Sequence, residues 1–325
     1  MSYQLDKKMV IGVSSRALFD LTIENEIFES QGVEAYCKYQ IEHEQDILKP
    51  GPGFGLIKAL LKLNECKPEK ELVEVIIMSR NSPDTSLRVF NAIKHYGLGI
   101  TRSVLVSGAA LAPYLKAFHT DLFLSAYEDD VQYAIDSGIA AGIICTEGNS
   151  AVYDSPENVK SFPGTHSQIR IAFDGDAVLF TDESEQIFQE KGLRAFEENE
   201  RIHALQPLEE GPFASFLRKL SDLQSELGLD GSPIRTALVT SRSAPAHERV
   251  IRTLRAWNVR VDEAFFLGGI EKKDVLSAFG AQIFFDDQSV HTLSASKQVP
   301  AARVPYRRVR KREELHNELQ TYCTG

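Results

Sequence analysis

The sequence has no long apolar run: no stretch of its 325 residues approaches the ~18 apolar residues of a membrane-spanning helix. The first apolar segment, residues 9–13, contains Gly12 and is followed directly by Ser14 and Arg16, so we expect no secretory signal. The cysteines form no CxxC pair, which favours reduced thiols in a cytoplasmic protein over a disulfide framework or a zinc site. They stand far apart, at Cys37, Cys66, Cys145 and Cys323.

Basic residues are also in deficit. The 36 Lys and Arg residues against 46 Asp and Glu residues give a formal net charge of −10. A general nucleic-acid binder needs a basic surface, so we expect neither nucleic acid nor a membrane as a partner. The basic segment 307–312 is expected to be a solvated tail or the start of a helix. The length predicts about two domains at roughly 100–200 residues each.

The chain contains an internal repeat with an offset close to 160 residues. Gly51-Pro52 corresponds to Gly211-Pro212, and a phenylalanine and a helical pattern follow each pair. Hydrophobic periodicity alone does not place such residues at a nearly constant offset, so we infer a duplication. Further matching pairs are Gly32 and Gly192, His43 and His203, Ser79-Arg80 and Ser241-Arg242, and Arg88 and Arg249. The predicted domains are residues 1–160 and 161–325, with their boundary in the loop-like segment 148–168.

Short apolar runs alternate with amphipathic helical patterns in both halves. This alternation is typical of βαβ units and a parallel sheet, so the predicted class is α/β with two tandem Rossmann-like halves. The predicted strands are residues 9–13, 73–78, 103–108, 120–125, 169–173, 236–239, 264–269 and 281–287. In such sheets the functional residues gather beyond the carboxyl ends of the strands.

Polar side chains lie at the carboxyl end of each of the four predicted strands of the second half or just after it. They are Asp174 and Asp176, then Thr240, Ser241 and Arg242, then Lys272 and Lys273, and finally Asp286 and Asp287. This set suits phosphoryl transfer: a carboxylate can attack phosphorus, and Mg²⁺ binds one or two carboxylates together with substrate phosphate. A hydroxyl and an ammonium can hold the equatorial phosphate oxygens.

In these segments the sequence resembles haloacid-dehalogenase-type phosphatases and, more narrowly, the cytosolic 5′-nucleotidase I family, the AMP-preferring type. The resemblance covers nearly the whole chain and is most specific at residues 173–185. The matching segments are FDGDAVLFTDESE (173–185), LVTSR (238–242), FFLGGIEK (265–272), IFFDDQ (283–288), VSSRALFDL (13–21), SRNSP (79–83) and YLKAFHTDLFLSAYEDDV (114–131).

The resemblance implies a role for each matching residue. Asp174 becomes the nucleophile and a Mg²⁺ ligand, and Asp176 the general acid and base with its backbone carbonyl on the metal. Asp286 becomes a second carboxylate on the metal, a role that Asp287 is open to sharing. Thr240 and Lys272 hold the phosphate, with Ser241 and Arg242 as further substrate-binding residues; Lys272 is preferred to Lys273 on the GGxxK spacing.

The first half lacks this catalytic set, because Ser14 and Arg16 stand where the second half has Asp174 and Asp176. We expect it either to support the fold alone or to shape the nucleoside pocket or bind an effector nucleotide. In the second half, the insertion 181–235 is expected to form a small helical cap over the site. The acidic runs 183–190 and 197–200 are expected on solvated helix faces.

The sequence therefore predicts a Mg²⁺-dependent hydrolase of nucleoside 5′-monophosphates that works through an aspartyl-phosphate. Two alternatives stay open: a phosphatase for sugar phosphates or other small phosphomonoesters, and a nucleotide-binding regulator without turnover. The base and sugar preference, regulation by ADP or ATP and the oligomeric state are not fixed by the sequence.

Overall fold

The computed structural model describes residues 4–146, 168–228 and 231–306. The basic segment 307–312 and nearly all of the predicted domain boundary 148–168 lie outside these residues. Among the described helices, none has the length and apolar character needed to cross a membrane. Cys37, Cys66 and Cys145 form no disulfide within the described chain, and Cys323 lies outside it.

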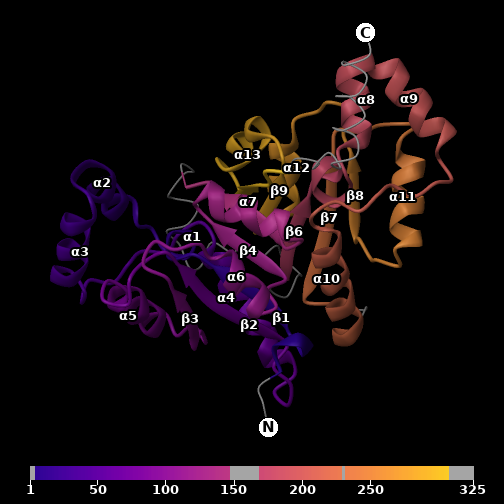
Figure 1. The fold of residues 1–325 in the computed structure, drawn as a ribbon. Coiled ribbons are helices and arrows are strands. Elements are labelled where there is room, and N and C mark those ends of the chain that lie inside the picture. Colours follow the sequence, from indigo (N-terminus) through magenta and orange to yellow (C-terminus); the bar gives the residue numbers. More distant parts are fainter. Residues whose placement is uncertain (1–3, 147–167, 229–230, 307–325) are drawn as a thin grey trace, which may run out of the picture.

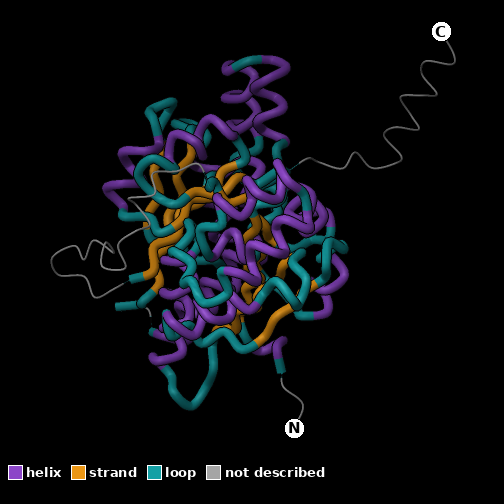
Figure 2. The backbone as a smooth tube through the Cα atoms, turned by 90° about the vertical axis from the view of Figure 1, so that its left-hand side faces the viewer, coloured by secondary structure: helices purple, strands orange, loops and turns teal. Residues whose placement is uncertain are grey.

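The described residues form one ten-stranded sheet with helices on both of its faces (Figures 1 and 2). The strands are β1 (Met9–Val13), β2 (Val73–Ser79), β3 (Arg102–Leu105), β4 (Leu122–Ser125), β5 (Ala140–Ile144), β6 (Ile169–Phe173), β7 (Ile234–Thr240), β8 (Glu263–Phe266), β9 (Ile283–Asp286) and β10 (Ala301–Arg303). The helices of the first half are α1 (Ser15–Leu18), α2 (Thr22–Gln31), α3 (Val33–Glu42), α4 (Phe54–Cys66), α5 (Leu87–His95), α6 (Ala112–Ala117) and α7 (Glu128–Asp136), after a short turn η1 (Leu5–Lys7). Those of the second half are α8 (Glu183–Lys191), α9 (Leu193–Ile202), α10 (Ala214–Leu227), α11 (His247–Ala256), α12 (Lys272–Phe279) and α13 (Ser289–Ala295), with the turn η3 (Gly175–Leu179) after β6.

The strand order confirms the α/β class. It is β3-β2-β1-β4-β5-β10-β9-β6-β7-β8, so each half follows the same order when it is read inward from its own edge of the sheet. Neighbouring strands within each half are parallel, as predicted. The halves do not form separate sheets, however, because β10 pairs antiparallel with β5 and joins them into one.

The backbone contacts correct one part of the repeat alignment. The Ser79 carbonyl accepts a hydrogen bond from Val106 N, and the Thr240 carbonyl accepts the matching bond from Leu267 N. Ser79 therefore corresponds to Thr240, and the predicted match of Ser79 with Ser241 is wrong. Two residues further on, Asn81 takes the place of Arg242.

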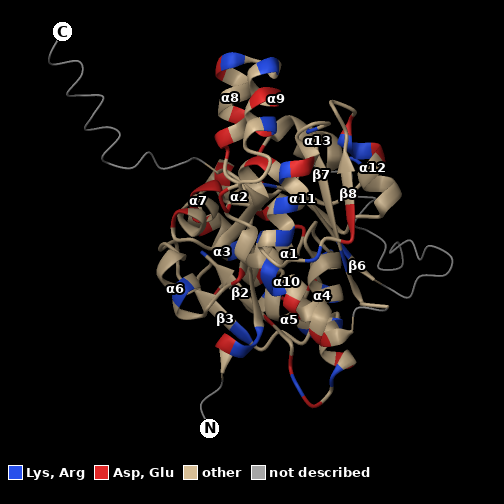
Figure 3. Cartoon of the chain, turned by 90° about the vertical axis from the view of Figure 1, so that its right-hand side faces the viewer, with Lys and Arg blue, Asp and Glu red and all other residues tan. Residues whose placement is uncertain are grey.

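Two helical hairpins project from the sheet, α2–α3 in the first half and α8–α9 in the second (Figure 1). The predicted cap 181–235 is therefore not one unit. The α8–α9 hairpin stands away from the sheet and carries charges of both signs (Figure 3), whereas α10 buries Phe216, Leu217 and Leu220 in the core. The helical periodicity of its apolar residues packs α10 against the core, so α10 is not part of a cap.

Candidate active site

The carboxyl ends of β6 and β9 place two carboxylates at the centre of the sheet's edge. Asp174 follows β6, and its backbone N–H bonds the Phe285 carbonyl of β9 at 2.8 Å. Its side chain is 6% exposed and accepts a hydrogen bond from Gly175 N at 2.7 Å. A Cβ atom on Gly175 would lie 3.3 Å from the Thr240 hydroxyl, so the absence of a side chain lets the two strand ends approach each other.

Lys272 joins the two strand ends. Its Nζ atom lies 2.8 Å from Asp174 Oδ2 and 2.6 Å from Asp286 Oδ2. Burial and the neighbouring Asp286 raise the pKa of Asp174 to about 7, although Lys272 opposes this shift. Burial alone would lower the pKa of Lys272, but the two carboxylates raise it above its ordinary value. Lys272 is therefore held as a cation between two anionic groups.

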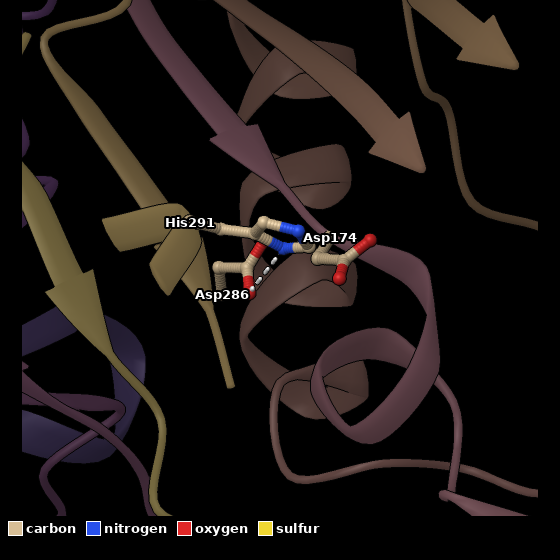
Figure 4. Close-up of side chains that lie close together, drawn as sticks. All are labelled: Asp174, Asp286 and His291. Carbon is tan, nitrogen blue, oxygen red and sulfur yellow. Dashed lines mark hydrogen bonds and ion pairs between the residues drawn. The ribbon is translucent and has the colours of Figure 1, made fainter. Parts of the chain in front are cut away.

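His291 on α13 is a partner of Asp286 that sequence reasoning missed. Its Nδ1 atom lies 3.1 Å from Asp286 Oδ2 (Figure 4). Gln288 N donates to Asp286 Oδ1 at 2.8 Å. Burial alone would raise the pKa of Asp286, but His291 and Lys272 lower it below its ordinary value. Ligand atoms of Asp174, Asp286 and His291 lie within 4.8 Å of one another. A lone histidine five residues after a carboxylate gave no usable signal in the sequence.

Asp287 has a buried carboxylate oxygen, Oδ1, without a hydrogen-bond partner in the described chain. Burial, together with Asp286, Asp174 and Glu185 nearby, raises the pKa of Asp287 to about 8. An unsatisfied anionic group in such a place is costly unless a cation compensates it. Asp174, Asp286 and Asp287 therefore offer hard oxygen atoms, the donors that Mg²⁺ prefers, and these residues fit such an ion.

Asp176 lies at the edge of this cluster and faces Arg242. The Arg242 Nε and NH2 atoms contact the two oxygens of Asp176 at 2.8 and 2.5 Å. The third nitrogen, NH1, lies 2.6 Å from Glu200 on α9. Glu200 is fully buried, which corrects the expectation that residues 197–200 lie on a solvated face. A run of acidic residues is typical of a solvated helix face, so nothing in the sequence indicated that Glu200 alone in this run turns inward and contacts two arginines.

The remaining predicted residues divide between the site and the surface. Thr240 is buried, and its hydroxyl accepts a hydrogen bond from Arg242 N at 3.2 Å. Ser241 is exposed, and Lys273 pairs with exposed Glu271 at 2.5 Å. Lys272, not Lys273, thus lies beside the carboxylates.

The first half has no carboxylate at the matching positions of the described chain. Ser125 takes the place of Asp286, and Arg16 donates to Asn25 at 2.8 Å where the second half has Asp176. Arg80 forms a two-pronged contact with Asp130 at 2.9 and 2.7 Å.

Comparisons with known proteins identify the family to which the chain belongs. The model of the 5′-nucleotidase family matches residues 1–311. Human cytosolic 5′-nucleotidase 1B is 38% identical over 299 residues, which are 89% of this chain and 47% of that protein, so the chain spans about half the length of this relative. Among solved structures, a putative UDP-N-acetylglucosamine 2-epimerase from Listeria monocytogenes matches 87% of this chain and 75% of the epimerase chain at 9% sequence identity. Its TM-score of 0.22 is too low to indicate a shared fold. On the match to the family model and to the human relative, the chain belongs to the 5′-nucleotidase family.

Proposed function

We propose that this protein hydrolyses nucleoside 5′-monophosphates such as AMP, with Mg²⁺ as cofactor and an aspartyl-phosphate as intermediate. The observation that carries the proposal is the buried cluster of Asp174, Lys272 and Asp286 at the carboxyl edge of the sheet. Family membership and the name of the human relative support the substrate class. The cytosolic location in that name agrees with the location we expect from the sequence.

Asp174 is the proposed nucleophile. One of its oxygens attacks phosphorus, and the bond between phosphorus and the ribose 5′-oxygen breaks while that oxygen takes a proton from Asp176. Water then attacks the phosphorus of the aspartyl-phosphate and gives its proton to Asp176. The bond to Asp174 breaks with its electron pair returning to the carboxylate, and phosphate leaves.

Two side chains are proposed to hold the phosphate while its charge shifts. Lys272 provides a fixed positive charge beside Asp174, and the Thr240 hydroxyl lies at the end of the adjoining strand. Such preorganised groups stabilise a transition state because they need no rearrangement during the reaction. The exposed Ser241 is proposed to contact the part of the substrate beyond the phosphate.

Mg²⁺ would be held by Asp174, Asp286 and the unpartnered oxygen of Asp287, with the Asp176 carbonyl as a further ligand implied by the family resemblance. When bound, it would neutralise charge on the phosphate and orient it. His291 and Gln288 N would keep Asp286 in place through the contacts that they make to its oxygens.

The architecture proposed for the second half is haloacid-dehalogenase-like, with the α8–α9 hairpin as a small cap. Glu185 on α8 accepts a hydrogen bond from Gln288 at 3.2 Å, so this hairpin contacts a residue next to Asp286 and Asp287. The first half is proposed either to support the fold alone, or to shape the nucleoside pocket or bind an effector nucleotide.

A phosphate-release screen tests the proposal. Purified protein with Mg²⁺ should release phosphate from purine or pyrimidine 5′-monophosphates faster than from sugar phosphates, and chelation by EDTA should abolish the reaction. ADP and ATP in parallel reactions test for an effector. Faster turnover of sugar phosphates would contradict the proposed substrate class. No phosphate release from any of the compounds tested would contradict the proposal that the protein is a phosphatase.

A further inference from the structure

Each half buries one arginine on the helix that follows its second strand. Arg88 on α5 donates its Nε–H to the Asp46 carbonyl at 2.9 Å, and Arg249 on α11 donates to the Gln206 carbonyl at 3.0 Å. Both side chains are almost fully buried. The matching contacts identify them as equivalent residues of the repeat.

The carboxylate that neutralises this arginine comes from a different helix in each half. In the first half Glu24 of α2 pairs with Arg88, and Gln40 of α3 lies at 3.5 Å. In the second half Ser184 replaces that glutamate, and Glu200 of α9 replaces the glutamine. A glutamate on the second helix of the hairpin is therefore not needed to neutralise the buried arginine.

Glu200 has a second contact that has no counterpart in the described part of the first half. Its Oε1 atom accepts from Arg249 at 2.9 Å and from Ser184 at 2.8 Å, whereas its Oε2 atom accepts from Arg242 at 2.6 Å. The Arg242 guanidinium also lies 5.3 Å from the Phe196 ring of α9. In the first half, Asn81 stands in the place of Arg242. Among the residues that the structure describes, the extension from Glu200 to Arg242 exists only in the half that has Asp176.

The geometry of Arg242 specifies which step this extension serves. Both oxygens of Asp176 accept hydrogen bonds from the planar guanidinium, an arrangement that suits an ionised carboxylate. A carboxylic acid that donates its proton to a leaving group would lose one of these two acceptors. The contact therefore fits the step in which Asp176 accepts a proton.

We propose that Glu200 is a positioning residue: it fixes Arg242, and Arg242 holds the Asp176 carboxylate in the orientation used when water hydrolyses the aspartyl-phosphate. In that step water forms a bond to phosphorus, its proton passes to Asp176, and the bond from phosphorus to Asp174 breaks. This inference rests on the proposed function and adds a residue of the projecting hairpin to its second step.

The test compares Glu200→Gln with wild type on p-nitrophenyl phosphate, by stopped-flow and steady-state kinetics. We expect kcat to fall about tenfold or more, up to the ~10²–10⁴-fold that general acid–base catalysis contributes as a whole. Because only the second step slows, KM should fall with kcat, kcat/KM should stay within about threefold, and a burst of nitrophenol equal to the enzyme concentration should appear. An unchanged kcat would overturn the proposal. An equal loss of kcat and kcat/KM without a burst would also overturn it, because that result indicates a structural role of Glu200 or a contact of Arg242 with phosphate.

Two further variants separate positioning from stability. The double variant Ser184→Glu/Glu200→Gln copies the arrangement of Glu24 and Gln40, so Arg249 keeps a carboxylate partner while Arg242 loses one. It should fold and show the same burst. If Glu200→Gln alone unfolds, this double variant provides the test. Glu24→Gln, the matched control, should lower thermal stability without a burst. Activity of wild type on AMP is measured in parallel: failure with AMP alone contradicts the proposed substrate, whereas a missing burst in both Glu200 variants contradicts this inference.

Discussion

Ser125 and Asp286 occupy the same place in the two halves. Ser125 Oγ accepts a hydrogen bond from Tyr127 N at 3.1 Å, and Asp286 Oδ1 accepts one from Gln288 N at 2.8 Å. The repeat has kept the backbone of this strand end and exchanged its side chain. A hydroxyl in place of a carboxylate removes the charge that a divalent cation needs.

We therefore predict one Mg²⁺ per chain, bound in the second half. Isothermal titration of the metal-free protein should give a stoichiometry near one, and Asp286→Asn should weaken binding by about tenfold or more, since second carboxylates contribute strongly to such sites. Ser125→Ala serves as the control and should leave binding unchanged. A second ion, lost on changes in the first half, would contradict this prediction.

Lys272 should be more important for stability than its neighbour Lys273. Lys272→Met leaves Asp174 and Asp286 buried without their shared cation, which is expected to cost about 3–5 kcal/mol of unfolding free energy. Lys273→Met removes an exposed pair with Glu271 and should change stability little. Urea unfolding in EDTA measures both variants. Equal stabilities would show that Lys272 does not hold the strand ends together.

Gly211 is predicted to tolerate no side chain. A Cβ atom there would lie 2.4 Å from the Phe180 carbonyl oxygen and 2.7 Å from that of Val178, so Gly211→Ala should destabilise the fold by about 1–3 kcal/mol. The control is Gly55→Ala on α4, where a Cβ atom meets nothing within 4 Å. Thermal melting of both variants checks the difference; a Gly211→Ala protein as stable as wild type would contradict the close packing of Gly211 against Phe180 and Val178.

Eight of the ten strands in the described chain, all but β5 and β10, could be predicted because apolar runs and the repeat are local or periodic in the sequence. The pairing of β5 with β10 could not, since two short apolar strands do not reveal that their edges meet. Asp174, Lys272 and Asp286 were predictable because each follows a strand of the same parallel sheet.

The parts that sequence reasoning missed depend on side-chain direction. Glu200 and His291 each lie on a helix whose turn decides whether the side chain faces solvent or the site. The alignment of Arg80 with Arg242 was wrong because identical residue types suggested an equivalence that the hydrogen bonds to the Ser79 and Thr240 carbonyls correct.

The central claim is that Asp174 forms a covalent aspartyl-phosphate. The most direct measurement is acid quenching of the enzyme during turnover of AMP labelled with ³²P, followed by peptide mapping. The account predicts label on the peptide that contains Asp174, released by hydroxylamine, and more of it in Glu200→Gln. Asp174→Asn should carry no label, keep its fold by circular dichroism, and lose more than about 100-fold of kcat, or roughly 2.7 kcal/mol of transition-state stabilisation. Label on another residue, or an Asp174→Asn enzyme that retains more than about a hundredth of wild-type kcat, would contradict the claim.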